Sequence, residues 1–131
     1  MPLIAQLSAL LGAAIHVWFF VLESLLFGRP GVAARFGLRT EEQIAAVRPM
    51  AFNQGFYNLF LAIGAIIGVV LIWAGGADSA GEIAGRALVL FTLGSMVAAA
   101  LVLLTTGMKY LRPALIQGTL PLIGFVLFLF S

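Results

Sequence analysis

Four long stretches of the chain are almost continuously apolar, and short polar segments separate them. The stretches cover residues 3–27, 50–74, 83–107 and 113–130. A helix needs roughly 20 residues to cross about 30 Å of hydrocarbon, and each stretch is close to that length. Apolar and polar residues do not alternate, as they would in the strands of a membrane barrel. The pattern predicts an all-α, polytopic membrane protein whose four transmembrane helices form a single domain over residues 1–131.

Short connections imply that neighbouring helices run antiparallel, in an up-down-up-down bundle. The first connection, residues 28–49, is longer than the others and has structure of its own. Thr40 is placed to cap a short amphipathic helix from Glu41 to Val47 at the membrane interface. The second span is expected to begin after that helix, with Pro49 in its first turn, where proline is tolerated.

Composition supports the membrane assignment, and charge orients the chain. Of 131 residues, 63% are hydrophobic and only 9% are charged, which lies outside the range of soluble domains. The basic residues are Arg29, Arg35, Arg39 and Arg48 in the first connection, Arg86 beside the second, and Lys109 and Arg112 in the third. The positive-inside rule then predicts cytoplasmic first and third connections and both termini outside, in an inner (plasma) membrane. This topology explains the net charge of +2 without a nucleic-acid partner.

Polar side chains within the apolar stretches gather at one depth, in the cytoplasmic half. Glu23 lies near the cytoplasmic end of the first stretch. The stretch Asn53-Gln54-Gly55-Phe56-Tyr57-Asn58 supplies Asn53, Gln54, Tyr57 and Asn58 at the start of the second, and Gln117 lies at a similar depth in the fourth. Arg48, Lys109 and Arg112 are expected to form the rim, and His16 lies one level deeper. Together these residues predict a polar pocket that binds a ligand.

His16 and Glu23 are the candidates for proton transfer in this pocket. An ionisable group inside a membrane costs about 2.5–3.5 kcal/mol on insertion scales, so Glu23 is expected to face the bundle interior or a wet cavity. His16 precedes it by about 10.5 Å along the helix axis, at nearly the same azimuth. Structural alternatives stay open for every member. The carboxamides could serve only as hydrogen-bonding groups between helices. Glu23 could form an ion pair with Arg48 or Arg112. His16 could be a hydrogen-bonded histidine of the core.

The residue inventory restricts the chemistry without selecting a single function. The chain has no cysteine, and one histidine with one nearby carboxylate is too small a ligand set for a usual zinc or iron site. We expect no metal and no cofactor. The favoured reading is a membrane protein that binds a lipid-like or small amphipathic ligand. An enzyme doing acid–base chemistry on an isoprenoid or lipid, a small oligomeric proton-coupled transporter and a purely structural role stay open.

Glycine spacing leaves the oligomeric state open as well. Gly64 and Gly68 form a GxxxG pair in the second stretch. Such a pair lets helices approach closely. It serves either packing inside one bundle or an interface between subunits, in a dimer or a trimer.

Several of these motifs occur together in a known family. The chain contains His16-x6-Glu23, Phe36-Gly37, the Asn53–Asn58 motif running into Phe60-Leu61-Ala62, and Gln117-Gly118 followed by Pro121. In this it resembles a family of small bacterial four-helix membrane proteins known only as a domain of unknown function, number 1304. It departs from that pattern after Glu23, where fewer aromatic residues follow than expected. The resemblance implies the fold and the membrane location but no activity.

A weaker similarity concerns the second helix of another family. Arg48-x4-Asn53 and its aromatic continuation are similar to a motif of the membrane-associated eicosanoid and glutathione metabolism proteins. That similarity implies four helices, a cytoplasmic first loop and a trimer. The motif there continues Asn-x-x-Glu, whereas position 56 here is Phe56. The arginine and tyrosine set expected on the last helix is also missing, which weakens any implication of glutathione binding.

Overall fold

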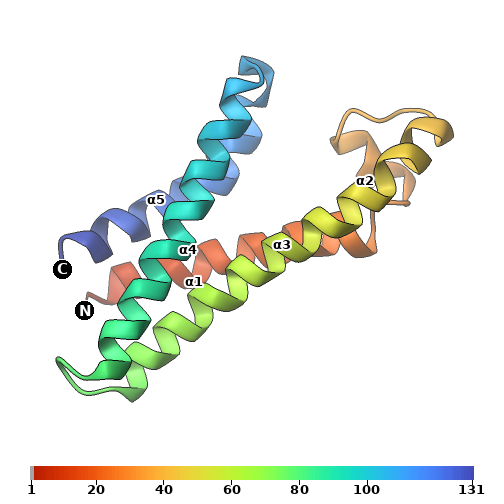
Figure 1. Cartoon of the computed structure of the whole chain (residues 1–131). Coiled ribbons are helices and arrows are strands. Elements are labelled where there is room, and N and C mark those ends of the chain that lie inside the picture. Colours follow the sequence, from red (N-terminus) through yellow and green to blue (C-terminus); the bar gives the residue numbers. More distant parts are fainter. Residues whose placement is uncertain (1) are drawn as a thin grey trace. The chain divides into compact units, whose positions relative to one another are not determined.

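The computed structural model of the chain describes residues 2–131, and over that range it contains helices and loops without strands. In chain order the elements are α1 (Leu3–Phe20), the π-helical turn η1 (Val21–Leu25), α2 (Pro30–Arg35), α3 (Glu41–Ala74), α4 (Ala80–Thr105), the 3₁₀ turn η2 (Met108–Tyr110) and α5 (Leu111–Leu129) (Figure 1). The predicted all-α class is confirmed.

Helical segments that are long and apolar enough to cross a membrane correspond to the predicted spans. They are Leu3–Leu25, Glu41–Ala74, Ala80–Thr105 and Met108–Leu129. A helix pairs its backbone N–H and C=O groups internally, which is why long apolar runs fold as helices in lipid. The protein is therefore a multi-pass membrane protein of four apolar helices. The sides on which its termini lie stay a prediction.

Contacts divide the chain into two compact units. The first unit comprises Met1–Ile15 and Leu61–Ser131, and the second unit comprises His16–Phe60. Both boundaries fall inside helices, one in α1 and one in α3. Each unit has its own internal packing, and the single domain over residues 1–131 stays a prediction.

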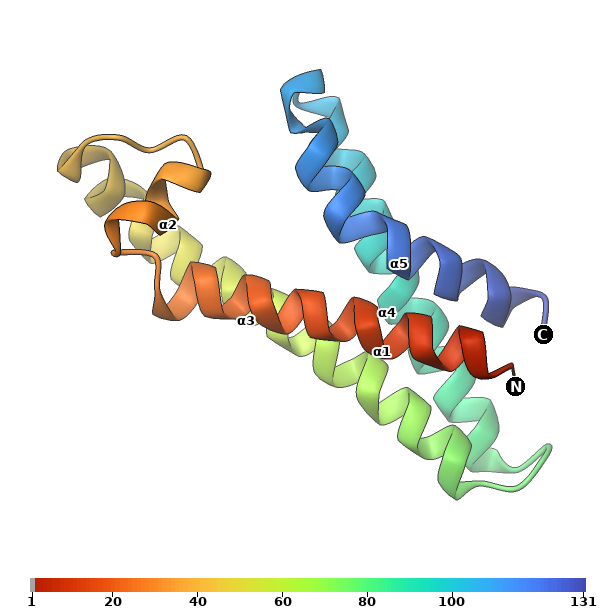
Figure 2. The same ribbon diagram turned by 180° about the vertical axis from the view of Figure 1, so that it is seen from behind.

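The first unit combines a small apolar core with close helix packing. Within it, α4 and α5 run antiparallel and side by side (Figures 1 and 2). The fully buried core side chains are Ala5, Ala9, Val69, Val89, Leu93, Met96 and Phe128. Gly68 of α3 faces α4, because a Cβ built on it would lie 2.8 Å from the Gly85 carbonyl oxygen. A Cβ on Gly64 would lie 2.7 Å from Thr92 Cγ2. The GxxxG pair thus packs against another helix of the same chain.

Arg86 ties α4 to the C-terminal end of α5. Its Nη2 donates to the carbonyl oxygens of Phe128, at 3.0 Å, and Ser131, at 2.9 Å. The last carbonyl groups of a helix lack intrahelical donors and carry partial negative charge. A cationic side chain there supplies hydrogen-bond donors and also a favourable charge. Arg86 therefore helps to hold α4 and the end of α5 together within the first unit.

In the second unit, α3 begins with the cap that the sequence predicts. The Gln43 N–H donates to Thr40 Oγ1 at 3.1 Å, and the Thr40 N–H donates to Gln43 Oε1 at 3.3 Å. This reciprocal pair is a capping box, and it satisfies two backbone donors at the helix start. The predicted N-terminus of the amphipathic segment at Glu41 is confirmed.

The end predicted for that segment is wrong. The helix does not stop at Val47 but continues through Pro49 to Ala74 as one helix of 34 residues. Proline inside a helix removes a single backbone N–H, so the Ala45 carbonyl loses its usual donor while the other helical bonds persist. Such prolines are tolerated in membrane helices. The amphipathic segment and the second span are thus one continuous element.

Gly68→Ala is expected to destabilise the protein. The added Cβ would lie 2.7 Å from Val89 Cγ2 and 2.8 Å from the Gly85 carbonyl oxygen, and the backbone of α4 cannot yield as a flexible side chain can. Overpacking of this kind costs about 1–3 kcal/mol. Thermal unfolding in detergent should show a lower midpoint than for the wild-type protein. Gly31→Ala is the control, because nothing lies within 4 Å of a Cβ built there. Equal midpoints for both variants would contradict the packing described.

Candidate functional site

Glu23 and Asn58 are hydrogen-bonded to each other in the second unit. Glu23 belongs to η1 and Asn58 to α3, and both side chains are half-buried. The Asn58 Nδ2 donates to Glu23 Oε1 at 2.7 Å. The carboxyl group therefore has a neutral amide as its partner, and within the second unit no ion pair joins it to Arg48.

Ser24 and Gly55 bring η1 against α3 beside this pair. The Ser24 Oγ donates to the Phe52 carbonyl oxygen at 2.7 Å. A Cβ built on Gly55 would collide with the Ser24 side chain. Glycine thus permits a close approach of the two backbones, as small residues do between membrane helices. Asn58 lies one helical turn beyond Gly55 and so comes within reach of Glu23.

Aromatic rings also pack between α1 and α3 in the second unit. Phe56 of α3 packs edge-on against Phe20 of α1, with ring centroids 5.0 Å apart. Its ring centroid lies 5.0 Å from that of Phe52 and 6.2 Å from that of Phe60. Aromatic side chains therefore accompany the Glu23–Asn58 pair. Two of them are largely exposed, since Phe52 is 51% and Phe60 is 59% accessible.

Glu23 lies in the middle of a π-helical turn that the sequence reasoning did not foresee. The Leu26 N–H donates to the Val21 carbonyl oxygen at 2.9 Å, five residues back. The turn closes the C-terminal end of the first span, where π-turns commonly occur. The wider turn also changes the azimuth of Glu23 relative to His16 from that of a uniform 3.6-residue helix. The turn contains neither glycine nor proline, so no local signal marked it.

The remaining residues of the carboxamide motif and His16 have different environments. Asn53, Gln54 and Tyr57 are exposed on α3, and in the part of the chain that the structure describes their side chains form no hydrogen bond. His16 is only 2% exposed, and its ring packs edge-on against Phe19 with centroids 5.4 Å apart. The structure thus joins Asn58 to Glu23 and leaves the neighbouring carboxamides accessible.

Three further predicted site residues belong to the first unit. Gln117 is half-buried in α5, and Arg112 is exposed at the start of that helix. Lys109 in η2 is exposed, with its Nζ 5.1 Å from the centroid of the Tyr110 ring. A pocket shared by these residues with Glu23 stays a prediction.

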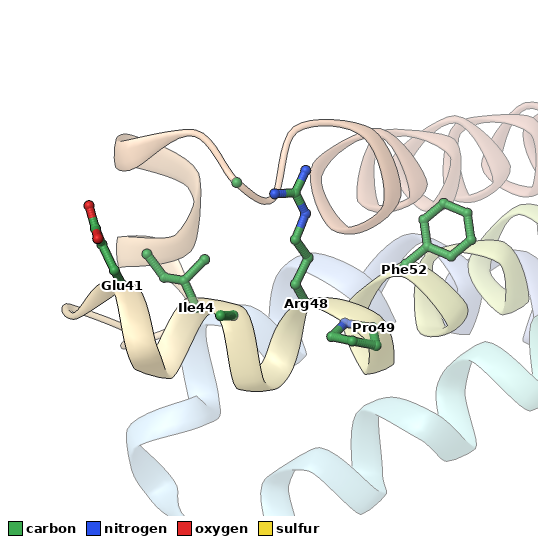
Figure 3. A pocket seen from close by; sticks show the side chains of 7 residues that line it. Glu41, Ile44, Arg48, Pro49 and Phe52 are labelled. Carbon is green, nitrogen blue, oxygen red and sulfur yellow. The ribbon is translucent and has the colours of Figure 1, made fainter.

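A groove of about 600 Å³ opens beside the N-terminal part of α3 (Figure 3). It is lined by Gly28, Glu41, Ile44, Ala45, Arg48, Pro49 and Phe52. An adjoining hollow of about 520 Å³ shares Gly28, Glu41 and Ile44 with it and adds Pro30, Ala34, Leu38 and Arg39. We call the two together the loop groove. Neither Glu23 nor any carboxamide of the 53–58 motif lines it.

Arg48, expected at the rim of the carboxamide pocket, lines the loop groove and crosses it. Figure 3 shows its side chain reaching from α3 towards the first connection. A Cβ built on Gly28 would lie 2.7 Å from Arg48 Nη1 and 3.0 Å from Cζ, so the guanidinium rests against the glycine. Sequence reasoning singled out Arg48 but missed Gly28, whose role depends on a contact between distant positions.

The chemistry open to the Glu23–Asn58 pair is hydrogen bonding and proton exchange. A carboxyl group and a carboxamide together offer several acceptors and the amide protons, so they can hold a polar group of a ligand. Among residues 2–131, no group of three or more His, Cys, Asp or Glu side chains is arranged to hold a metal ion.

Comparison with known proteins gives one match. The model of a family described as "Protein of unknown function (DUF1304)" matches residues 10–129. The resemblance stated from the sequence motifs is therefore confirmed at the level of the family. No curated protein and no solved structure matches the chain.

Energetic coupling between Glu23 and Asn58 is expected in a double-mutant cycle. Because the two side chains bond directly, Glu23→Leu and Asn58→Leu, each of which removes one partner of the bond, should be non-additive in the free energy of unfolding. Hydrogen bonds between membrane helices average about 0.6 kcal/mol and reach about 1.7 kcal/mol. The cycle is measured by reversible unfolding in mixed micelles. Ser95→Ala supplies the control cycle with Glu23→Leu, because Ser95 Oγ donates to the Phe91 carbonyl oxygen in its own helix. Additivity of the Glu23 and Asn58 variants would argue against the bond.

Proposed function

As the chain belongs to the DUF1304 family, whose description names no activity, we propose a function from its polar site: it binds a lipid-like or small amphipathic ligand inside the membrane. Glu23 and Asn58 form the centre of the proposed site, and the accessible carboxamides Asn53 and Gln54 with Tyr57 extend it along α3. His16, which belongs to the same unit, is a proposed further member because it lies one level deeper in the first apolar stretch.

The single observation that carries this proposal is the Glu23–Asn58 hydrogen bond between membrane-spanning segments. A carboxyl group there costs about 2.5–3.5 kcal/mol on insertion scales. One neutral hydrogen bond recovers only about 0.6–1.7 kcal/mol of that cost. A carboxyl group has more acceptor capacity than one amide fills, so a polar group of a ligand would complete the site.

The neighbouring surface suits an amphipathic ligand. Asn53, Gln54 and Tyr57 offer hydrogen-bonding groups without a partner among residues 2–131. The exposed rings of Phe52 and Phe60 lie on the same helix. A molecule with a small polar head and an apolar body would satisfy both kinds of surface at once.

Acid–base catalysis on an isoprenoid or lipid is the second candidate function. The observation that favours it is that Glu23 is a half-buried carboxyl group whose partner is the neutral amide of Asn58, so an ion pair does not hold it in one protonation state within the second unit. A catalytic Glu23 would transfer a proton to or from the bound substrate. The two candidate functions differ in the effect of Glu23→Gln. In an enzyme the variant should lose turnover, whereas in a binding protein it should lose the bound ligand.

We further propose that the protein resides in an inner (plasma) membrane, with the first and third connections cytoplasmic. Arg29, Arg35 and Arg39 precede α3, and Arg48 lies in the N-terminal part of α3. Together these four residues dominate the charge bias that orients the chain. Arg86, the basic residue beside the second connection, is engaged with the end of α5. A position of Arg86 on the outer side of the membrane is therefore compatible with the positive-inside rule. A dimer or trimer of this chain is compatible with the proposed site.

Native mass spectrometry of the protein released gently from membranes should show a small-molecule adduct. Glu23→Gln and Asn58→Leu should each lose that adduct, because they remove the carboxylate and the amide that hold the polar head. The same spectra give the number of subunits. Thr119→Val is the matched control, since the Thr119 hydroxyl donates to Leu115 of its own helix at 2.6 Å.

Two outcomes would contradict the binding proposal. The first is a clean apo mass of the wild-type protein at every gentle condition. The second is that every adduct of the wild-type protein persists unchanged in Glu23→Gln and Asn58→Leu. Persistence of the adduct in Glu23→Gln, with loss of turnover of the identified molecule, would favour the enzyme instead.

Fusions to reporter proteins test the proposed orientation. Alkaline phosphatase fused after Ser131 should be active, and green fluorescent protein fused there should be dark, because the C-terminus is expected outside. Fusions truncated after Gly37, in the first connection, should give the reverse pattern. Fluorescence of the full-length fusion would contradict the orientation.

A further inference from the structure

The loop groove carries an excess of positive charge. Its lining includes Arg48 and Arg39 as basic side chains and Glu41 as the acidic one. The Arg48 guanidinium forms no ion pair or hydrogen bond with other residues in the range 2–131. A guanidinium offers a planar fork of donors that matches a phosphate group. The groove is therefore complementary to one negative charge.

Gly28 fixes where that positive charge lies. Three guanidinium atoms would lie within 3.2 Å of a Cβ built on Gly28. The absence of a side chain there thus leaves room for Arg48 to lie flat against the first connection. The position of this charge depends on a contact between residues 20 positions apart in the chain. Arg48 and Arg35 are both exposed, but Arg35 does not line the groove.

The two ends of the groove differ in polarity along α3. Glu41 and Arg48 are charged, whereas Phe52 lies within the apolar stretch that starts at residue 50. Ile44 and Pro49 add apolar lining between them. Phe52 is 51% exposed although it belongs to a membrane-spanning segment. The groove therefore runs from the polar interface into the hydrocarbon, as a lipid molecule does.

We propose that the loop groove binds one anionic phospholipid, whose phosphate contacts the Arg48 guanidinium and whose acyl chains pass over Phe52. Basic pockets at the cytoplasmic side of membrane helices bind lipid head groups in this way. Glu41, at the other end, disfavours a second negative charge and so favours a lipid with a single phosphate. This site goes beyond the proposed function, because neither Glu23 nor Asn58 lines the groove.

Titration of delipidated full-length protein with phosphatidylglycerol, followed by native mass spectrometry, tests the site. One lipid should bind before any others. Arg48→Gln should weaken that first binding about tenfold, because it removes the charge-assisted contact to the phosphate. Arg35→Gln makes the same change in net charge outside the groove and should alter the affinity less than about twofold. Arg48→Lys should recover only part of the loss.

A second variant keeps every charge and tests the geometry. Gly28→Ala should displace the flexible Arg48 side chain and weaken phosphatidylglycerol binding several-fold, while the fold is retained. Gly31→Ala is its control, because nothing lies within 4 Å of a Cβ there. Glu23→Gln should leave the affinity unchanged, so failure of this site and failure of the Glu23–Asn58 site are distinguishable.

The ligand class is tested with related molecules. Diacylglycerol, which has no phosphate, should bind more weakly than phosphatidylglycerol and should be insensitive to Arg48→Gln. Phosphatidylcholine, whose phosphate is balanced by its own cation, should also bind more weakly than phosphatidylglycerol. Soluble glycerol phosphate should not compete. Equal losses in Arg48→Gln and Arg35→Gln, no difference between Gly28→Ala and Gly31→Ala, or efficient competition by glycerol phosphate would each overturn the proposal.

Discussion

The structure depends on one constraint, which is that polar groups inside a membrane must find partners within the protein. Backbone groups do so by forming helices, and several hydroxyl groups return to carbonyls of their own helix, as in Thr92, Ser95 and Thr119. Glu23 and Asn58 do not follow this local solution. Their side chains bond to each other across two elements. The pair therefore joins η1 to α3 within the second unit.

Small residues make the remaining contacts possible. In the first unit Gly68 and Gly85 let α3 and α4 approach to backbone distance, and in the second unit Gly55 lets η1 approach α3 beside the polar pair. Gly28 has a different effect, since it leaves space for a guanidinium instead of a helix. The same lack of a side chain thus serves helix packing in some places and the presentation of a charge in another.

Two candidate binding features lie along α3, and they differ in kind. The Glu23–Asn58 pair lies between membrane-spanning segments, beside exposed carboxamides and aromatic rings. The loop groove lies at the N-terminal part of the helix, which Pro49 extends without a break. Continuity of α3 therefore places the lining of the loop groove and Asn58 on a single element. An amphipathic segment ending at Val47 would have uncoupled them.

The sequence by itself determined the four apolar helices, the membrane location, the capping box at Thr40 and the family, because each rests on local pattern, length or motif. It also singled out Glu23 and Asn58 as polar residues inside apolar stretches, and Arg48 as a residue at the rim of the predicted pocket. Only the tertiary structure decided which partner each residue has. The Glu23–Asn58 bond and the contact of Gly28 with Arg48 each join positions far apart in the chain, and the π-turn at Glu23 has no local signal of its own. Such features follow from the packing of helices against each other, which periodicity along one helix does not encode.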